Sequence, residues 1–241
     1  MNKRATNSSF LNERLDFNAK YSRADFLSWL TGHLSSIPFC TVLDVGCGTG
    51  AQAVWFGRKV LNRGKTCAFD ISESSISQLK SSLPAGISVE TCVGSMDELI
   101  SVVKDNFSNI KFDLVHSSYS LYYARDINSV LEAMFVLLEP SGSLAISGPY
   151  ETNTLLSFLS RFHDIPQLSW DCLKFIDDCV LPFCNKRFRN IESHIFINDQ
   201  FVTDVNDFAR FYRSATFFNP AAEKRVLKEV LLKELNFIQL P

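Results

Sequence analysis

Residues 41–50, TVLDVGCGTG, hold the strongest single signal for the fold of this chain. A short β-rich run leads directly into three glycines at alternate positions, and one carboxylate, Asp44, stands just before them. Glycine has no Cβ, so it reaches positive φ angles and lets the backbone approach another group closely. The stretch therefore predicts a strand that ends in a tight loop suited to close approach by a ligand.

From this stretch to about residue 150 the chain alternates between strand-like and helix-like patterns. Strand-like runs lie at 41–45, 66–71, 87–93, 111–117 and 143–148, the last after a turn at 140–142. Helical patterns lie between them, at 51–62, 73–83, 97–104 and 128–138. This order predicts an α/β fold with a doubly wound, Rossmann-like, mostly parallel sheet and helices on both faces. Ligands in such sheets bind beyond the carboxyl ends of the strands.

The segments on either side of this alternation differ from it. Residues 22–34 have the spacing of an amphipathic helix, and residues 151–220 hold about half of the 21 phenylalanines. Later patterns favour strands at 193–199 and 200–204 and helices at 205–214 and 221–235. We therefore expect an N-terminal helical cap at 1–36, a cofactor-binding core at 37–150, and an aromatic-rich C-terminal elaboration at 151–241 in the same domain. This elaboration either forms a lid over a pocket or only covers the core and a dimer face.

The composition is that of an ordinary globular chain, with 46% hydrophobic residues, 21% charged residues and a net charge of −2. This balance gives no electrostatic reason to expect a nucleic acid or an anionic membrane as a partner. No apolar run reaches the roughly 18 residues that cross a bilayer. The seven cysteines show no CxxC pair and no zinc spacing. We therefore expect structural thiols, no metal and a cytoplasmic location.

A second carboxylate, Asp70, ends the second predicted strand and helps to define the ligand. Its oxygens suit the hydroxyl groups of a ribose, because each of them accepts hydrogen bonds. A dinucleotide is one such ligand, since Gly46, Gly48 and Ala51 meet the relaxed dinucleotide-binding pattern. Asp44 instead favours a cationic ligand, because a carboxylate before the loop repels a pyrophosphate and attracts a cation. S-adenosylmethionine carries an ammonium, a sulfonium and a ribose, and it has no phosphate.

Five segments, in this order, resemble the motifs of class I S-adenosylmethionine-dependent methyltransferases. They are VLDVGCGTG (42–50), AFDIS (68–72), VGSMDEL (93–99), FDLVHSSYSLYY (112–123) and LLEPSGSLAISGP (137–149). The similarity covers about residues 10–150, and five ordered motifs are far more specific than any one of them. The chain is identified as a member of this family, which implies S-adenosylmethionine as the cofactor and S-adenosylhomocysteine as its product.

The resemblance implies a role for each matching position at the methionine and ribose end. Asp44 would hold the methionine end together with the loop backbone of Gly46, Cys47, Gly48, Thr49 and Gly50. Asp70 would hold the ribose. Tyr21, in a stretch similar to the cap helix of many relatives, would meet the carboxylate end of the cofactor. The structural alternatives are a loop-capping Asp44, an Asp70 that caps the next helix in place of Ser72, and a Tyr21 that only packs in the core.

At the adenine and sulfonium end the resemblance implies a further set of contacts. Ile71 would lie against the adenine, and Gly94, Ser95 and Met96 would border it. Relatives often have Asp where Ser95 stands, and a serine hydroxyl can also accept from the adenine amino group. Ser117 would close the pocket near the sulfonium.

The acceptor side is less defined by the sequence. His116 is the candidate general base because imidazole titrates near neutral pH, and packing within the sheet is the structural alternative. The NPPY and DPPY motifs are absent, which disfavours amino-methyltransferases of DNA bases or protein glutamine. Candidates for the substrate pocket are Tyr119, Tyr122, Tyr123, Tyr150, His163 and Trp170.

We expect methyl transfer to a small-molecule acceptor, at oxygen or nitrogen rather than carbon. The alternatives are a methyltransferase acting on tRNA or protein, a cofactor-binding but inactive partner subunit, and a nicotinamide-dependent oxidoreductase. Class I relatives end with an antiparallel hairpin at the sheet edge, whereas here the last helical pattern gives way to NFIQLP (236–241). Either the chain is truncated or a short sheet edge is covered in another way, for which we expect a homodimer or a partner subunit.

Overall fold

The computed structural model describes residues 3–35, 37, 39–60, 64–108, 111–150 and 154–232. The chain forms two compact units. One unit, here called the sheet unit, comprises Thr31–Pro149 and Ile176–Arg189. The other, here called the aromatic unit, comprises Met1–Leu30, Tyr150–Phe175 and Asn190–Pro241. The division into segments 1–36, 37–150 and 151–241 stays a prediction.

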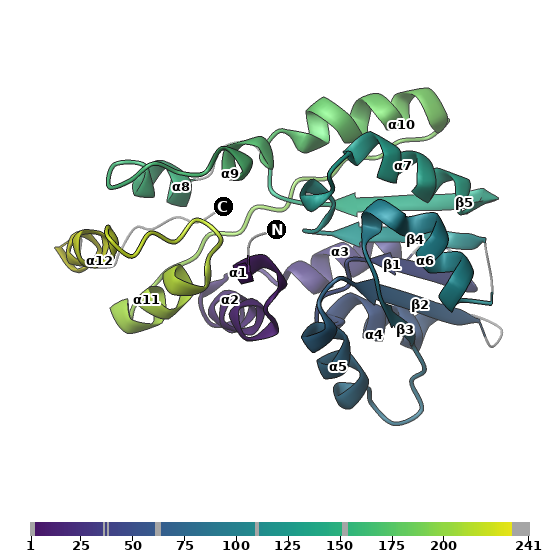
Figure 1. Ribbon diagram of the computed structural model, residues 1–241, viewed down its shortest axis with the longest axis horizontal. Coiled ribbons are helices and arrows are strands. Elements are labelled where there is room, and N and C mark those ends of the chain that lie inside the picture. The colour runs from purple at the N-terminus through teal and green to yellow at the C-terminus, as the bar shows by residue number, and fades with distance from the viewer. Residues whose placement is uncertain are drawn as a thin grey trace. The chain divides into compact units, whose positions relative to one another are not determined.

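The sheet unit is built on a five-stranded, all-parallel sheet with the order β3-β2-β1-β4-β5 (Figure 1). The strands are β1 (Thr41–Val45), β2 (Lys65–Asp70), β3 (Glu90–Val93), β4 (Phe112–Ser118) and β5 (Leu138–Ser147). The strand order reverses between β1 and β4, which makes their carboxyl ends the switch point of the sheet. The predicted α/β, doubly wound fold is confirmed.

Helices cover both faces of this sheet (Figure 1). Four of them connect the strands: α4 (Ala51–Lys59), α5 (Glu73–Ser82), α6 (Leu99–Asn106) and α7 (Ile127–Val136). Ala53 of α4 and Ile76 and Leu79 of α5 pack around Ala68 of β2, so α4 and α5 share one face. Right-handed crossovers put α6 and α7, which pack together, on the opposite face.

Shorter elements complete the sheet unit. They are the 3-10 helices η1 (Met96–Glu98) and η2 (Leu121–Tyr123), the π-helix η3 (Ile176–Val180) and α10 (Leu181–Arg187). Arg187 of α10 forms an ion pair with Glu132 of α7, and its guanidinium lies over the ring of Phe135. These contacts attach the segment at 176–189 to the sheet unit rather than to its neighbours in sequence.

The boundaries of several elements differ from the predicted ones. The strand predicted at 87–93 begins at Glu90, and the helix predicted at 22–34 begins at Phe26. The helix predicted at 51–62 ends at Lys59, and Val60 has extended backbone angles. The turn predicted at 140–142 lies inside β5, where Phe112 pairs with Leu138 but Leu114 already pairs with Ser143. A bulge in β5 therefore accommodates these residues without ending the strand.

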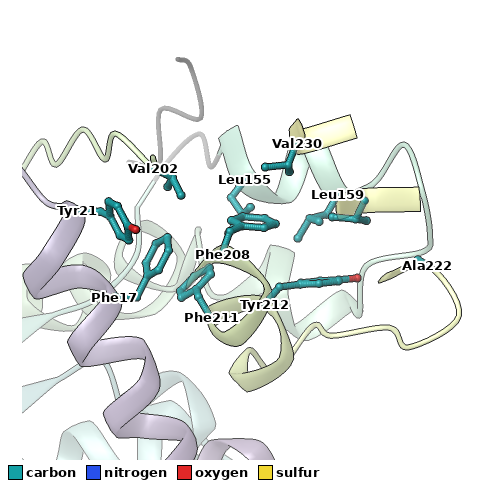
Figure 2. Close-up of a cluster of buried hydrophobic side chains, with 11 residues drawn as sticks. Phe17, Tyr21, Leu155, Leu159, Val202, Phe208, Phe211, Tyr212, Ala222 and Val230 are labelled. Atoms are coloured by element: carbon teal, nitrogen blue, oxygen red, sulfur yellow. The ribbon is translucent and has the colours of Figure 1, made fainter. Parts of the chain in front are cut away.

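The aromatic unit is helical and has its own core (Figure 2). Its helices are α1 (Lys3–Thr6), α2 (Ser8–Tyr21), α8 (Thr154–Leu159), α9 (Gln167–Asp171), α11 (Val205–Ser214) and α12 (Glu223–Leu232), and α3 (Phe26–Leu34) begins in it. Phe17 of α2 stacks on Phe211 of α11 with ring centroids 4.3 Å apart. Tyr21, Leu159, Phe208 and Val226 are buried in the same cluster. Burial of aromatic side chains at this density holds α2, α8, α11 and α12 together.

Several expectations for the aromatic unit need correction. Residues 193–199 and 200–204 do not form strands; the described pairing there is one isolated bridge between Ser22 and Gln200. Phe196 packs on Trp29 at 5.2 Å between ring centroids, whereas Ile195 and Ile197 are 63% and 74% exposed. The apolar pattern thus belongs to an irregular segment in which the ring of Phe196 packs on Trp29. The predicted segment 236–241 lies outside the described residues.

Helix α2 begins after an N-cap asparagine, Asn7, which is a start signal present in the sequence. The Asn7 side chain accepts hydrogen bonds from the N–H groups of Ser9 and Phe10, which caps the helix.

The helices predicted at 205–214 and 221–235 are present as α11 and, over its described length, α12. Within the described ranges, no helix combines the length and the apolar character that a membrane span requires.

Candidate cofactor site

The glycines after β1 are required by backbone geometry. Gly46, Gly48 and Gly50 have φ angles of 72°, 54° and 90°. A Cβ at Gly46 would lie 2.5 Å from the Cβ of Ser120, and a Cβ at Gly50 would lie 2.2 Å from a methyl carbon of Leu79. Both the left-handed conformation and the close neighbours exclude a side chain. The loop therefore brings β1, α5 and the segment after β4 closer together than other residues allow.

The backbone N–H groups of this loop are mostly directed into the protein. Gly46 and Cys47 both donate to the carbonyl of Phe69, at 2.9 and 3.0 Å. Gly48 donates to Oδ2 of Asp70 at 2.9 Å, and Gly50 donates to the carbonyl of Cys47 at 3.0 Å. These four N–H groups are thus engaged within the protein, and the role of the loop backbone toward a cofactor stays a prediction. A pyrophosphate needs such donors, so their engagement argues against the dinucleotide alternative.

Asp70 joins the loop to the next helix. Its Oδ2 accepts from Gly48, and its Oδ1 accepts from the N–H of Ser72 at 2.8 Å. Burial raises the pKa of Asp70, and these two N–H groups oppose the shift. The helix cap of α5 is Ser72, whose hydroxyl accepts from Ser75, as predicted. Each carboxylate oxygen of Asp70 keeps a second lone pair, with which it can accept from a ribose hydroxyl.

Asp44 and His116 form a buried pair between the two central strands. They are register partners on β1 and β4, and Nδ1 of His116 lies 2.8 Å from Oδ1 of Asp44. Asp44 is 1% exposed and His116 is 0% exposed. Among the described residues, Oδ2 of Asp44 and Nε2 of His116 have no hydrogen-bond partner. Buried polar atoms are normally satisfied, so these two require an explanation.

The N-terminus of α4 lies directly after the glycine loop. Its N-cap residue, Gly50, offers no side-chain cap. The first turn of a helix carries unsatisfied N–H groups and a partial positive charge, which favour a carboxylate. The positive end of α4 would complement the carboxylate of an α-amino acid, and the carboxylate of Asp44, which precedes the loop, would complement its ammonium.

Apolar side chains lie at the carboxyl ends of β2 and β3. Ile71 is 44% exposed, and Val93, which pairs with Asp70, is 49% exposed. Sequence reasoning missed Val93; an apolar residue directly before Gly94, at the end of a strand, was the available signal. Such exposed apolar surface suits the face of an adenine ring.

The residues predicted to border the adenine have defined contacts of their own. The N–H of Gly94 donates to the carbonyl of Asp70 at 3.0 Å. The Ser95 hydroxyl accepts from the N–H of Asp97 at 3.3 Å and caps η1. The terminal methyl of Met96 comes within 3.5 Å of a Cβ built at Gly46. The roles of Gly94, Ser95 and Met96 toward a cofactor stay predictions.

Ser117 belongs to a buried hydroxyl network. Its Oγ lies 2.7 Å from Oγ of Ser120, which donates to the carbonyl of Val45 at 2.9 Å. Ser117 is 0% exposed. The network ties the end of β4 to the end of β1. Ser120 could not be predicted from the sequence because its partner, Val45, lies 75 residues away in the chain. A contact from Ser117 to a sulfonium stays a prediction.

The segment after β4 carries three of the predicted pocket residues. Tyr119 has a φ angle of 51° and is 46% exposed, and its N–H donates to the carbonyl of Ser147 at 2.9 Å. A left-handed conformation is unusual for a bulky residue and is often retained where it serves a site. Tyr122 and Tyr123 follow on η2, with ring centroids 4.6 Å apart. Their roles toward an acceptor stay predictions.

The other predicted site residues belong to the aromatic unit. The Tyr21 hydroxyl donates to Oδ2 of Asp207 at 2.6 Å, and Tyr21 is buried among Phe17 and its neighbours. His163 Nε2 lies 2.9 Å from the Tyr212 hydroxyl, and its Nδ1 lies 2.9 Å from the carbonyl of Asp164. Tyr150 and Trp170 are half-buried. The polar atoms of Tyr21 and His163 are thus engaged within the unit, and their site roles stay predictions.

Comparison with known families gives a match to the methyltransferase domain over residues 38–169. The match covers more than half of the chain and spans all the strands of the sheet. Among solved structures, the chain is similar to a candidate methyltransferase from Bacillus halodurans C-125, with a TM-score of 0.57 and 17% identity. That likeness covers 85% of this chain and 83% of the other, and at this identity it shows the fold.

Curated relatives are matched over a shorter region. The chain is 32% identical over 124 residues to a human mitochondrial protein named arginine-hydroxylase NDUFAF5, which is 51% of this chain and 33% of the human protein. The mouse protein of the same name is 34% identical over 104 residues, or 43% of this chain and 27% of that protein. The chain therefore spans a third or less of the length of these relatives.

The donor set fits S-adenosylmethionine. Asp44 has a buried oxygen without a described partner, α4 has an uncapped positive end, and Ile71 and Val93 offer an apolar edge. The family match and the fold agree with these features. The chain belongs to the methyltransferase-domain family, the class I S-adenosylmethionine-dependent methyltransferases, and S-adenosylmethionine is its cofactor.

Proposed function

We propose that the chain transfers the methyl group of S-adenosylmethionine to a small-molecule acceptor, at oxygen or nitrogen. The observation that carries the proposal is the arrangement at the end of β1. Oδ2 of Asp44 needs a donor, the first turn of α4 needs an anion, and the loop donors are engaged. An amino-acid end meets both needs, whereas a dinucleotide phosphate meets only one and faces a carboxylate.

When bound, the cofactor supplies a sulfonium methyl group that an acceptor can take by in-line displacement. The residues of this chain act by holding and orienting. Asp44 and α4 would fix the amino-acid end, Asp70 the ribose, and Ile71 and Val93 the adenine. Much of the rate of such a transfer comes from holding the reacting atoms about 3–3.5 Å apart.

The segment after β4 favours an uncharged small acceptor. Residues 117–124, SSYSLYYA, carry hydroxyl and aromatic groups and no charged side chain. Arg125, the next charged residue in sequence, is already paired with Asp97. Its Nε and its backbone N–H donate to the Asp97 carboxylate, at 2.9 and 2.8 Å. A surface of this kind suits an aromatic or hydroxylated molecule better than a phosphate backbone.

A protein acceptor is the second candidate, because the human relative is named an arginine hydroxylase. An arginine side chain is best recognised by carboxylates that pair with its guanidinium. The segment 117–124 supplies none. We therefore rank a protein acceptor below a small molecule. The proposal includes a location in the cytoplasm, no membrane or nucleic-acid partner, and a homodimer or partner subunit.

The test has two stages. Calorimetric titration compares S-adenosylmethionine, S-adenosylhomocysteine and NAD on the wild type and on Asp70→Ala. Both adenosyl ligands should bind to the wild type, NAD should not bind, and Asp70→Ala should weaken binding. The protein is then incubated with methyl-labelled cofactor and, separately, a dialysable metabolite extract, tRNA and total protein. Label in the dialysable fraction supports the proposal; label in protein or tRNA contradicts it, and binding without any transfer favours the inactive-subunit alternative.

A further inference from the structure

The contacts of His116 are with Asp44 and with Phe56 of α4, and they do not support a role as the general base for the acceptor. A general base must come within about 3 Å of the proton that it removes. His116 is 0% exposed, and its ring meets the ring of Phe56 on α4 edge-on, with centroids 5.1 Å apart. The side chain therefore packs between the sheet and α4, and its polar contact is with Asp44.

The chemistry of the pair defines its donor. An ionised carboxylate only accepts hydrogen bonds, so the proton between the two groups belongs to Nδ1 of His116. The distance of 2.8 Å between Nδ1 and Oδ1 is that of a charge-assisted hydrogen bond. Nε2 has no described partner, and a neutral imidazole with its proton on Nδ1 leaves Nε2 without one.

The register makes this contact specific. Asp44 and His116 are direct partners across the parallel pair of β1 and β4, so their side chains leave the same face of the sheet. Without the imidazole of His116, the carboxylate of Asp44 could rotate about its side-chain bonds. With Nδ1 on Oδ1, the carboxylate plane is held and Oδ2 is the oxygen left over.

We infer that His116 is a positioning residue that orients Asp44, so that Oδ2 receives the ammonium group of the amino-acid end of S-adenosylmethionine. This inference rests on the proposed function. It assigns His116 to cofactor affinity rather than to proton removal from the acceptor. It also accounts for the two buried atoms of the pair that lack a described partner. Oδ2 of Asp44 would accept from the ammonium, and Nε2 of His116 carries no proton because the proton of the ring is on Nδ1.

The test compares His116→Leu, which removes the donor, with His116→Asn, whose amide nitrogen can take the place of Nδ1. Affinities are measured calorimetrically for S-adenosylmethionine and for 5′-methylthioadenosine, which lacks the amino-acid end. His116→Leu should weaken S-adenosylmethionine about tenfold and leave 5′-methylthioadenosine unchanged within about twofold. His116→Asn should restore most of the affinity for S-adenosylmethionine.

A double-mutant cycle with Asp44→Asn separates positioning from general damage. If His116 acts through Asp44, His116→Leu should have little further effect on S-adenosylmethionine affinity in the Asp44→Asn background. Equal weakening of both ligands, or additive effects in the cycle, would overturn the inference. Failure of the wild type to bind S-adenosylmethionine would instead refute the proposed function, which keeps the two claims distinguishable.

A spectroscopic measurement does not depend on the variants folding equally well. The 15N chemical shifts of the His116 ring in the wild type, assigned by the signal lost in His116→Asn, should show a protonated Nδ1 and a bare Nε2. A ring protonated at Nε2 alone would contradict the hydrogen bond to Asp44 on which the inference depends.

Discussion

Two buried aspartates, one in each unit, show how differently the same side chain is used. Asp44 in the sheet unit is 1% exposed, contacts His116, and keeps Oδ2 without a described partner. Asp207 in the aromatic unit is 7% exposed and is paired at both oxygens, with Lys20 and Tyr21 on Oδ2 and Arg210 on Oδ1.

The difference indicates two purposes. A carboxylate that is fully paired holds its surroundings together, and removing it leaves buried or tethered donors without a partner. A carboxylate with an unused, buried oxygen is costly to the apo fold and is explained by a ligand that completes it. We therefore propose that Asp207 serves stability and Asp44 serves binding, and the following variants test that division.

The largest effect is expected for the loop that follows Asp44. Gly46→Ala should lower the free energy of unfolding by about 2–5 kcal/mol, because it combines a strained positive φ with overlap against Ser120. Gly86→Ala is the matched control, since Gly86 also has a positive φ but nothing lies within 4 Å of its added Cβ. Denaturant unfolding should show the larger loss at Gly46; equal losses would mean that close packing of the loop is not what the site requires.

The next effect concerns Asp207 itself. Asp207→Asn should lower the Tm clearly, because Lys20 and Arg210 lose their charged partner and Tyr21 meets a weaker acceptor. The ion pair of Lys65 with Glu90 is the control, because both side chains are substantially exposed and surface pairs contribute about 0–1 kcal/mol. A Tm loss in Asp207→Asn no greater than in Lys65→Gln would contradict the structural role of Asp207.

A smaller effect is expected for Tyr21, and it separates two interpretations of this residue. Tyr21→Phe removes one hydrogen bond to Asp207 and keeps the ring among Phe17 and Phe211, so stability should fall by about 1 kcal/mol. If Tyr21 serves only this network, the Kd for S-adenosylmethionine should not change. A weaker Kd at unchanged stability would favour the cofactor contact that the family resemblance implies.

The smallest effect is a pH dependence of the Asp207 network. Hydrogen bonds from Lys20 and Tyr21 lower the pKa of Asp207 in the folded protein. Its contribution to stability is therefore fully present above the unfolded pKa of about 3.9 and is lost as the pH falls through the folded value. The Tm difference between the wild type and Asp207→Asn should be constant near neutral pH and narrow below about pH 4. A difference that widens in acid would contradict the assignment.

Much of the sheet unit could be predicted because its signals are local. Short β-rich runs, the spacing of Gly46, Gly48 and Gly50, and a serine before α5 each act within a few residues, and they placed β1, the loop and the α5 cap correctly. The ordered motifs then indicated the cofactor. The pairing of side chains across strands could not be predicted, because the contact between Asp44 and His116 depends on the register of β1 with β4.

The aromatic unit was less predictable for the same reason. Lys20 and Asp207 lie 187 residues apart in sequence, and no local pattern connects them. The alternation at 193–199 resembled a strand, but its backbone found no partner strand among the described residues, and Phe196 is held by Trp29 instead. The apolar pattern did not even identify the buried side chains here, because Ile195 and Ile197 are 63% and 74% exposed.

The most direct test of the division between the two aspartates is one calorimetric comparison. S-adenosylmethionine is titrated into the wild type, Asp44→Asn and Asp207→Asn, and the Tm of each unliganded protein is measured on the same samples. We predict that Asp44→Asn weakens binding by about 10- to 100-fold and lowers the Tm less than Asp207→Asn does. Asp207→Asn should lower the Tm and leave the Kd unchanged. Wild-type affinity in Asp44→Asn would contradict the account, because Oδ2 of Asp44 would then not be the atom that receives the cofactor.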